Sequence, residues 1–360
     1  MEFRFYFVRK AHPIKKAQEG RPLTQQQLLA APLSPAQPSP ADPRYFPSAF
    51  DQFLTSKVYG INDDTYRHYM RSDIERGREI ARVLSSWSSL QRKDVLDIGC
   101  GYGGLLIVMK EAGAKAISGI EVDQERLDWA ALRLTGLDYP AELLRLDICD
   151  QKSLRQLGLF DVVLAQDVLE HVLDPVAAIR NISALLRPGG VVYVQVGNKF
   201  SPDQLLADHH YKLPGITMLS RAQAIEYWQI RCGRDPSEYG VGYWREEKYY
   251  RHVFSRAGVK LHRADHFSSP DEILWYAEAI SQVCKLLEGS PWPDLRPALA
   301  RRMHRRMRKL VELYVHASRQ LPGIESQPEL VAHACDAIVG RLLTGVWRLV
   351  GVKESGSSSQ

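Results

Sequence analysis

The chain has 360 residues, 45% of them hydrophobic and 25% charged, which is ordinary for a folded globular protein. Its formal net charge of +5 permits an anionic partner without requiring one. No stretch approaches the roughly 18 uncharged apolar residues of a membrane-spanning helix, and the polar first residues do not resemble a secretory signal. The five cysteines form no CxxC pair, so we expect a reducing, cytoplasmic setting.

The N-terminal part contains a proline-rich stretch followed by a predicted helical segment. Prolines punctuate residues 21–48, which favours extended and poorly packed chain, and we assign residues 1–56 to a leader or proline-rich linker. Intermittent apolar positions over 57–90 then predict helix, which we expect to act as a lid.

From Asp94 onward, short apolar runs alternate with helical patterns. This alternation predicts an α/β fold with a Rossmann-like, seven-stranded, mostly parallel sheet and helices on both faces. The strand-to-helix loops of such a sheet gather at one edge, where ligands bind. We therefore assign residues 91–198 to a cofactor-binding core.

Beyond residue 198 the alternation pauses and then resumes. The predicted segments are an acceptor-side insertion at 199–245, a core continuation at 246–270, a helical appendage at 271–340, a last core strand at 341–353 and a flexible tail at 354–360.

A glycine-rich turn follows the first predicted strand. Gly99, Gly101 and Gly103 permit close backbone approach and unusual dihedral angles directly after the apolar run Val95–Ile98. A dinucleotide site would need the spacing GxGxxG and a helix N-terminus that faces a pyrophosphate, whereas the spacing here is GxGxG. The turn by itself is a weak signal, because a plain glycine turn has the same pattern.

Acidic and polar residues end the next strands. Glu121 lies about twenty residues after the glycines, where a carboxylate can accept hydrogen bonds from both hydroxyls of a ribose. Asp147 ends the third strand and can accept a hydrogen bond from an adenine amino group. Gln166 ends the fourth strand, and the turn at 186–190 leads into the fifth.

Taken together and in this order, these stretches resemble the class I S-adenosylmethionine (SAM)-dependent methyltransferases. The similarity is strongest to the branch with ubiquinone- and menaquinone-pathway enzymes and small-molecule O-methyltransferases. It covers roughly residues 90–200 and implies SAM as cofactor and S-adenosylhomocysteine (SAH) as product. The resemblance places Asp97, Gly99 and Gly101 around the methionine half of SAM.

The same resemblance implies the other cofactor contacts. Glu121 would hold the ribose, Asp147 and the adjacent Ile148 the adenine, and Gln166 would lie next to the reactive sulfonium. Val122 and Cys100 complete the implied site, although Cys100 is also the right size for a packing residue in the glycine loop.

The acceptor side is predicted from residues after the fifth strand. The stretch 208–215 resembles a His-Tyr-x-Leu-Pro segment of this branch, and histidine suits the removal of a hydroxyl proton. We take His210 as the first candidate for the general base and His209 as the second. The alternative is that both histidines are surface or loop-bracing residues. Asn198 is a candidate to face the acceptor, and we predict no metal.

Two further features need an interpretation. Glu170 and His171 are predicted to brace the loop that begins the fourth helix, with catalysis as the alternative. The basic stretch 301–309 fits a solvated helix face. The alternatives are that it contacts a phosphate-bearing substrate, a membrane surface or another subunit, as in a homodimer.

The predicted function is therefore SAM-dependent methylation of an acceptor oxygen on a small molecule, saccharide or lipid-linked metabolite. No aromatic platform for stacked bases accompanies the basic stretch, so we do not expect a nucleic acid partner. The alternatives are an RNA or protein methyltransferase recruited through residues 301–309, and a non-catalytic SAM-binding scaffold.

Overall fold

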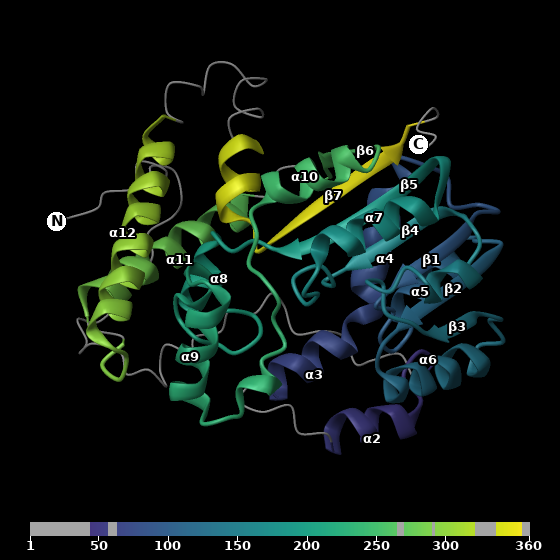
Figure 1. The fold of residues 1–360 in the computed structure, drawn as a ribbon, viewed down its shortest axis with the longest axis horizontal. Coiled ribbons are helices and arrows are strands. Elements are labelled where there is room, and N and C mark those ends of the chain that lie inside the picture. The colour runs from purple at the N-terminus through teal and green to yellow at the C-terminus, as the bar shows by residue number, and fades with distance from the viewer. Residues whose placement is uncertain (1–43, 57–62, 265–269, 290–291, 321–335, 355–360) are drawn as a thin grey trace.

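The centre of the protein is a seven-stranded sheet (Figure 1). The computed structural model describes residues 44–56, 63–264, 270–289, 292–320 and 336–354. The strand order is β3-β2-β1-β4-β5-β7-β6, and only β7 runs antiparallel to its neighbours. The strands are β1 Asp94–Ile98, β2 Ala116–Glu121, β3 Glu142–Arg145, β4 Phe160–Gln166, β5 Leu186–Gly197, β6 Val259–Arg263 and β7 Val346–Lys353. The predicted α/β Rossmann-like fold is confirmed.

Burial on both faces explains why the central strands are nearly continuous apolar runs. Val95 and Leu96 are both 0% exposed although their side chains point to opposite faces of β1. The chain leaves β3 at one edge and returns through β4 on the other side of β1. This reversal lies at the carboxyl ends of β1 and β4, which is where open α/β sheets bind ligands.

Helices cover both faces of the sheet, as the alternating pattern predicted (Figure 1). Buried side chains of α4 Asp73–Ser85, α5 Gly104–Glu111 and α6 Gln124–Gly136 form one hydrophobic cluster with one face. Those of α7 Pro175–Leu185 and α10 Glu247–Arg256 form a second cluster with the other face. Asp123 and Asp174 accept hydrogen bonds from the first-turn amides of α6 and α7, so both helices begin at capping aspartates.

The N-terminal leader differs from the prediction. Residues 48–56 form helix α2 (Ser48–Ser56), and Phe50 and Leu54 are 0% exposed. Tyr45 and Phe46 are buried in the same cluster. The expectation of poorly packed chain over 21–48 is wrong for Tyr45 and Phe46, because their large apolar side chains pack on the core despite the prolines around them. Residues 1–43 and the tail from 355 lie outside the described residues, and α3 (Asp63–Arg71) follows within the predicted helical segment.

The insertion and the helical appendage share one hydrophobic cluster. It joins Leu213 and Trp228 of the insertion to Met303 and Met307 of the appendage, all of them buried. The elements are α8 Pro202–Leu206, η2 Ile216–Met218, α9 Arg221–Cys232, η3 Pro236–Glu238, α11 Pro270–Glu288, α12 Pro297–Gln320 and a π-helix at Asp336–Leu343. Within the described ranges, no helix combines the length and apolar character needed to cross a membrane.

Candidate active site

The glycine-rich turn between β1 and α5 leaves an open cradle. Gly99 and Gly101 have φ of 67° and 52°, a region in which side-chain-bearing residues are strained. A Cβ atom added to Gly99 would lie 2.6 Å from Val168 Cγ2, so the turn admits no side chain there. Around Gly101 the nearest atom to such a Cβ is 4.0 Å away. The backbone at Gly101 is therefore accessible to a ligand.

Glu121 joins the end of β2 to this turn. Its Oε1 accepts hydrogen bonds from the amides of Val122 (2.8 Å) and Asp123 (3.2 Å), and its Oε2 accepts one from Gly101 (3.2 Å). The residue is buried. Three amides thus fix the carboxylate at the edge of the cradle. Asp97 is buried nearby, and burial followed by the charge of Glu121 raises its pKa.

The residues expected around the adenine lie at the ends of β2 and β3. Val122 is 56% exposed, which is unusual for a valine and offers a flat apolar surface. Asp147 is exposed and accepts a hydrogen bond from the amide of Cys149 (2.8 Å). Ile148 is buried, and its carbonyl accepts a hydrogen bond from the Asn181 side chain (2.7 Å).

Two further predicted residues complete the cofactor side. Among the described atoms, Gln166 Nε2 is buried at the end of β4 without a hydrogen-bond partner, and such an orphan donor suits a bound ligand. Cys100 is buried under the turn, and burial raises the pKa of its thiol. Cys100 therefore packs as a neutral side chain. The open cradle, the fixed carboxylate and the orphan amide together fit SAM.

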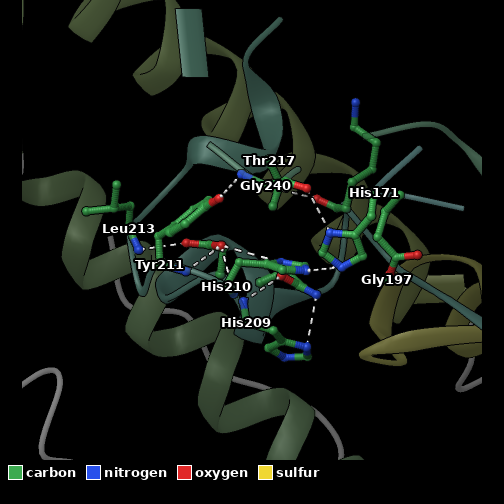
Figure 2. Close-up of polar contacts among 12 residues, drawn as sticks. His171, Gly197, His209, His210, Tyr211, Leu213, Thr217 and Gly240 are labelled. Atoms are coloured by element: carbon green, nitrogen blue, oxygen red, sulfur yellow. Dashed lines mark hydrogen bonds and ion pairs between the residues drawn. The ribbon is translucent and has the colours of Figure 1, made fainter. Parts of the chain in front are cut away.

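A pair of histidines lies on the acceptor side. His171 follows β4 and His210 lies in the insertion, yet their Nε2 atoms are 3.2 Å apart (Figure 2). Asp208 positions His210 by accepting hydrogen bonds from the amides of His210, Tyr211 and Leu213. The structure thus brings together one residue predicted as the base and one predicted as a brace.

Hydrogen-bond partners define the tautomers of this pair. His171 Nδ1 lies 2.9 Å from the carbonyl oxygen of Gly240, which can only accept, so His171 carries its proton on Nδ1. Its Nε2 is then an acceptor when the ring is neutral, and His210 Nε2 donates to it. Burial, and then the charge of His171, lowers the pKa of His210 well below its usual value. The pair is therefore neutral near pH 7, as a general base must be.

His209 and Asn198 have structural partners. His209 Nδ1 contacts Gln204 Nε2 (3.0 Å). Its Nε2 contacts Asp203 Oδ2 (2.8 Å), so both ring nitrogens have partners other than His171. Asn198 is 0% exposed, and its side chain donates to the carbonyl of Thr344 (2.8 Å) and accepts from the amide of Phe200 (3.0 Å). The Asn198 amide thus braces the exit of β5, and its role toward the acceptor stays a prediction.

Glu170 takes the bracing role predicted for it. Its Oε1 accepts a hydrogen bond from Gly197 (3.2 Å), and its carbonyl accepts bonds from Gly242 (2.6 Å) and Tyr243 (3.2 Å). These bonds fasten the exit of β5 and the end of the insertion to the loop after β4. Burial, and then the charge of Asp167, raises the pKa of Glu170.

A contact that the sequence did not indicate joins α3 to the loop after β4. Tyr69 donates to Asp167 Oδ2 (2.5 Å), and Gln195 Nε2 donates to both Asp167 oxygens (3.1 Å each). Asp167 has a φ of 54°, an uncommon conformation for a residue with a side chain. The only sequence signal was its position after β4. Among the described residues, no group of three or more His, Cys, Asp or Glu side chains is placed to hold a metal ion.

The sheet order, the glycine cradle and the fixed Glu121 carboxylate define a class I SAM-dependent methyltransferase. Residues 66–264, more than half of the chain, match the family described as "Methyltransferase domain", and the chain belongs to this family. It is an enzyme of the SAM-dependent class, with SAM as cofactor and SAH as product.

Curated relatives are ubiquinone biosynthesis O-methyltransferases. The chain is 35% identical to that of Vibrio parahaemolyticus over 126 residues, which cover 35% of this chain and 52% of the relative. It is 38% identical to that of Bordetella avium over 112 residues, 31% of this chain and 45% of the relative. The chain thus spans about half the length of these relatives. Among solved structures, the magnesium protoporphyrin IX methyltransferase from Synechocystis is similar, with 19% identity, a TM-score of 0.41 and coverage of 62% of this chain and 90% of that one.

Replacing Glu121 should weaken cofactor binding. We expect Glu121→Ala to reduce the free energy of SAM binding by about 1.5–3 kcal/mol, the usual worth of hydrogen bonds to a charged group. Glu121→Gln keeps the shape and should lose part of this energy. Calorimetric titration with SAM and with SAH measures the effect, and Glu142→Gln, at the start of the neighbouring strand β3, is the control. Wild-type affinity in both Glu121 variants would refute the ribose role.

Proposed function

We propose that this enzyme transfers the methyl group of SAM to a hydroxyl oxygen of a small molecule, saccharide or lipid-linked metabolite. The observation that carries the proposal is the neutral His171–His210 pair, 3.2 Å apart, beside the exits of β4 and β5. A hydroxyl acceptor has to lose a proton during transfer, and a neutral imidazole suits this task at physiological pH. The partial similarity to ubiquinone biosynthesis O-methyltransferases points to the same acceptor atom.

Bound SAM supplies an activated methyl group on a sulfonium. In the proposed reaction the backbone at Gly101, with Glu121, Asp147 and Gln166, orients this group at the edge of the sheet. His210 takes the hydroxyl proton on Nδ1 as the oxygen attacks, because its Nε2 already carries a proton. The resulting imidazolium keeps its Nε2–H hydrogen bond to His171 Nε2, and His171 keeps its Nδ1–H hydrogen bond to the Gly240 carbonyl.

Alignment of the acceptor is the other requirement, because bringing two reactants together in the right geometry supplies much of the rate. Trp244 stands against the base, with its ring centre 5.4 Å from that of His210 in an edge-to-face arrangement. A Cβ atom on Gly197 would lie 3.0 Å from Trp244 Cζ3, so glycine at the end of β5 makes room for this ring. We infer that Trp244 forms one wall of the acceptor site.

The proposal is tested by incubating the purified protein with SAM and a panel of catechols, phenols, sugars and amines. SAH formation and the mass of the methylated product are followed. We expect turnover with at least one hydroxyl acceptor and attachment of the methyl group to oxygen. Exclusive methylation of amines would refute O-methylation. SAM binding without turnover on any acceptor would favour the non-catalytic scaffold.

A further inference from the structure

Basic side chains surround Trp244, on the same side of the protein as the histidine pair. Lys199 lies two residues beyond β5, and its Nζ donates to the carbonyl of Trp244 (3.3 Å). The ammonium also lies 5.6 Å from the centre of the Phe200 ring. In the described part of the chain, no carboxylate forms an ion pair with Lys199.

Arg245 is held between aromatic rings, with no ion pair to a carboxylate of the residues that the structure describes. Its guanidinium carbon lies 4.6 Å from the centre of the Tyr243 ring and 4.9 Å from that of Tyr249. Its Nε is buried and has no hydrogen-bond partner among the described atoms. Two aromatic rings thus pre-orient a planar group that is suited to bidentate binding of a carboxylate or phosphate.

Arg306 brings a third positive charge from the basic face of α12. It donates to the carbonyl of Met218, and no ion pair to it occurs among the residues that the structure describes. Glu246 is the acid that acts on Lys199, and its Oε2 lies 2.8 Å from Lys248 Nζ. Burial lowers the pKa of Lys199, Glu246 opposes this effect, and the charges of Arg306 and Arg245 add to it. Three basic groups thus face one carboxylate, which is itself paired with Lys248, so positive charges outnumber negative ones here.

Trp244 connects this basic group to the reaction. Its carbonyl accepts from Lys199, its ring packs on His210, and the next residue is Arg245. A molecule that contacts Trp244 and offers a hydroxyl to His210 would thus lie next to the unpaired cations. An anion placed beside them would add to the partial compensation that Glu246 provides.

We propose that Lys199 and Arg245, with Arg306 beside them, bind anionic oxygens of the acceptor, so that the acceptor is a hydroxylated molecule with a carboxylate or a phosphate. The inference rests on the proposed O-methyl transfer and adds the charge of the substrate to it. Lys199 and Arg245 are specificity residues in this scheme, because they recognise a part of the acceptor that does not react.

The test measures binding and needs no turnover. The full chain, saturated with SAH, is titrated calorimetrically with benzoate, phenyl phosphate and neutral benzamide. We expect at least one anion to bind roughly 10- to 100-fold more tightly than benzamide, the range of a charge-assisted hydrogen bond. This preference should shrink as salt is added, because added ions screen partly exposed charges.

Variants then assign the preference to these residues. Lys199→Met and Arg245→Met should each remove most of it, and Lys199→Arg should retain it. SAH affinity should stay at the wild-type level in all three, which controls for folding. Lys260→Met, on exposed β6, is the matched control. Preference for benzoate alone identifies a carboxylate acceptor, and preference for phenyl phosphate alone a phosphorylated one.

Equal affinity for anions and benzamide, no detectable binding of either anion, or an undiminished preference in Lys199→Met and Arg245→Met would each overturn the anion site. These results leave the proposed reaction untouched, because a protein that methylates neutral phenols can still lack the preference. Conversely, an anion preference in a protein that methylates no hydroxyl would refute the reaction and keep the binding site.

Discussion

Arg133→Ala should reduce the free energy of unfolding by about 3–5 kcal/mol, the cost of leaving a buried charge without its partner. The Arg133 side chain is 0% exposed and pairs with Asp73 at 2.7 Å. It also donates to the carbonyls of Tyr45 (2.9 Å) and Tyr102 (2.8 Å). The substitution therefore strands one carboxylate and two carbonyl groups at once. Urea unfolding at pH 7, followed by circular dichroism, measures the loss.

Two controls separate this effect from a general loss of charge. Arg82→Ala removes an exposed partner 4.0 Å from Glu79 and should cost less than about 1 kcal/mol. The double variant Asp73→Asn/Arg133→Met removes both charges and should recover part of the stability, because a buried neutral pair has no stranded charge. If Arg133→Ala costs no more than Arg82→Ala, the buried network does not stabilise the fold in the way described.

His210→Ala should slow turnover by about 100-fold or more and leave SAM affinity unchanged, since a general base typically contributes 10²–10⁴-fold. The adjacent His209→Ala is the matched control. Both nitrogens of His209 have partners away from His171, so we expect its variant to keep most of the activity. Full activity of His210→Ala would remove His210 from the mechanism, and equal losses in the two variants would indicate a structural effect.

The pH dependence of kcat/KM gives a second readout for His210. Because burial lowers its pKa, His210 stays neutral and able to accept a proton at pH values where an ordinary histidine is already charged. The rate should therefore rise with pH and level off below the usual histidine pKa of about 6.5. The same shift means that His210 contributes stability that is present above that pH and is lost as the pH falls toward its lowered pKa. An acidic limb centred at or above pH 6.5 would contradict this assignment.

Local sequence signals predicted the sheet well, and they singled out Glu121 beside the glycine turn. The strands are short apolar runs because both faces of the sheet are covered, and Glu121 is recognisable because it ends the strand next to the glycine turn. Packing between distant segments was not predictable in this way. Phe50 and Leu54 lie among polar residues near a proline-rich stretch, and only the tertiary structure shows that they enter the core.

On the acceptor side too, single residues could be recognised from local sequence, but contacts between distant segments could not. His210 was singled out from its neighbours, but its partner His171 lies 39 residues earlier, and no local pattern links the two. Asn198 looked like a candidate because it follows β5. Its actual partners, the carbonyls of Arg341 and Thr344, come from a segment that periodicity could not connect to it. The Tyr69–Asp167 contact is non-local in the same sense.

The position of β7 bears on how the protein is made. Strand β6 pairs only with β7 in the described sheet, and β5 has β7 as its outer neighbour. As the chain leaves the ribosome, residues 94–197 can already assemble β1 to β5, while β6 has to wait for Val346 and the residues after it. Until then β5 presents an open edge, to which other chains can add. Strands β1 to β5 can thus pair before β7 has been synthesised, whereas β6 joins the sheet only after it.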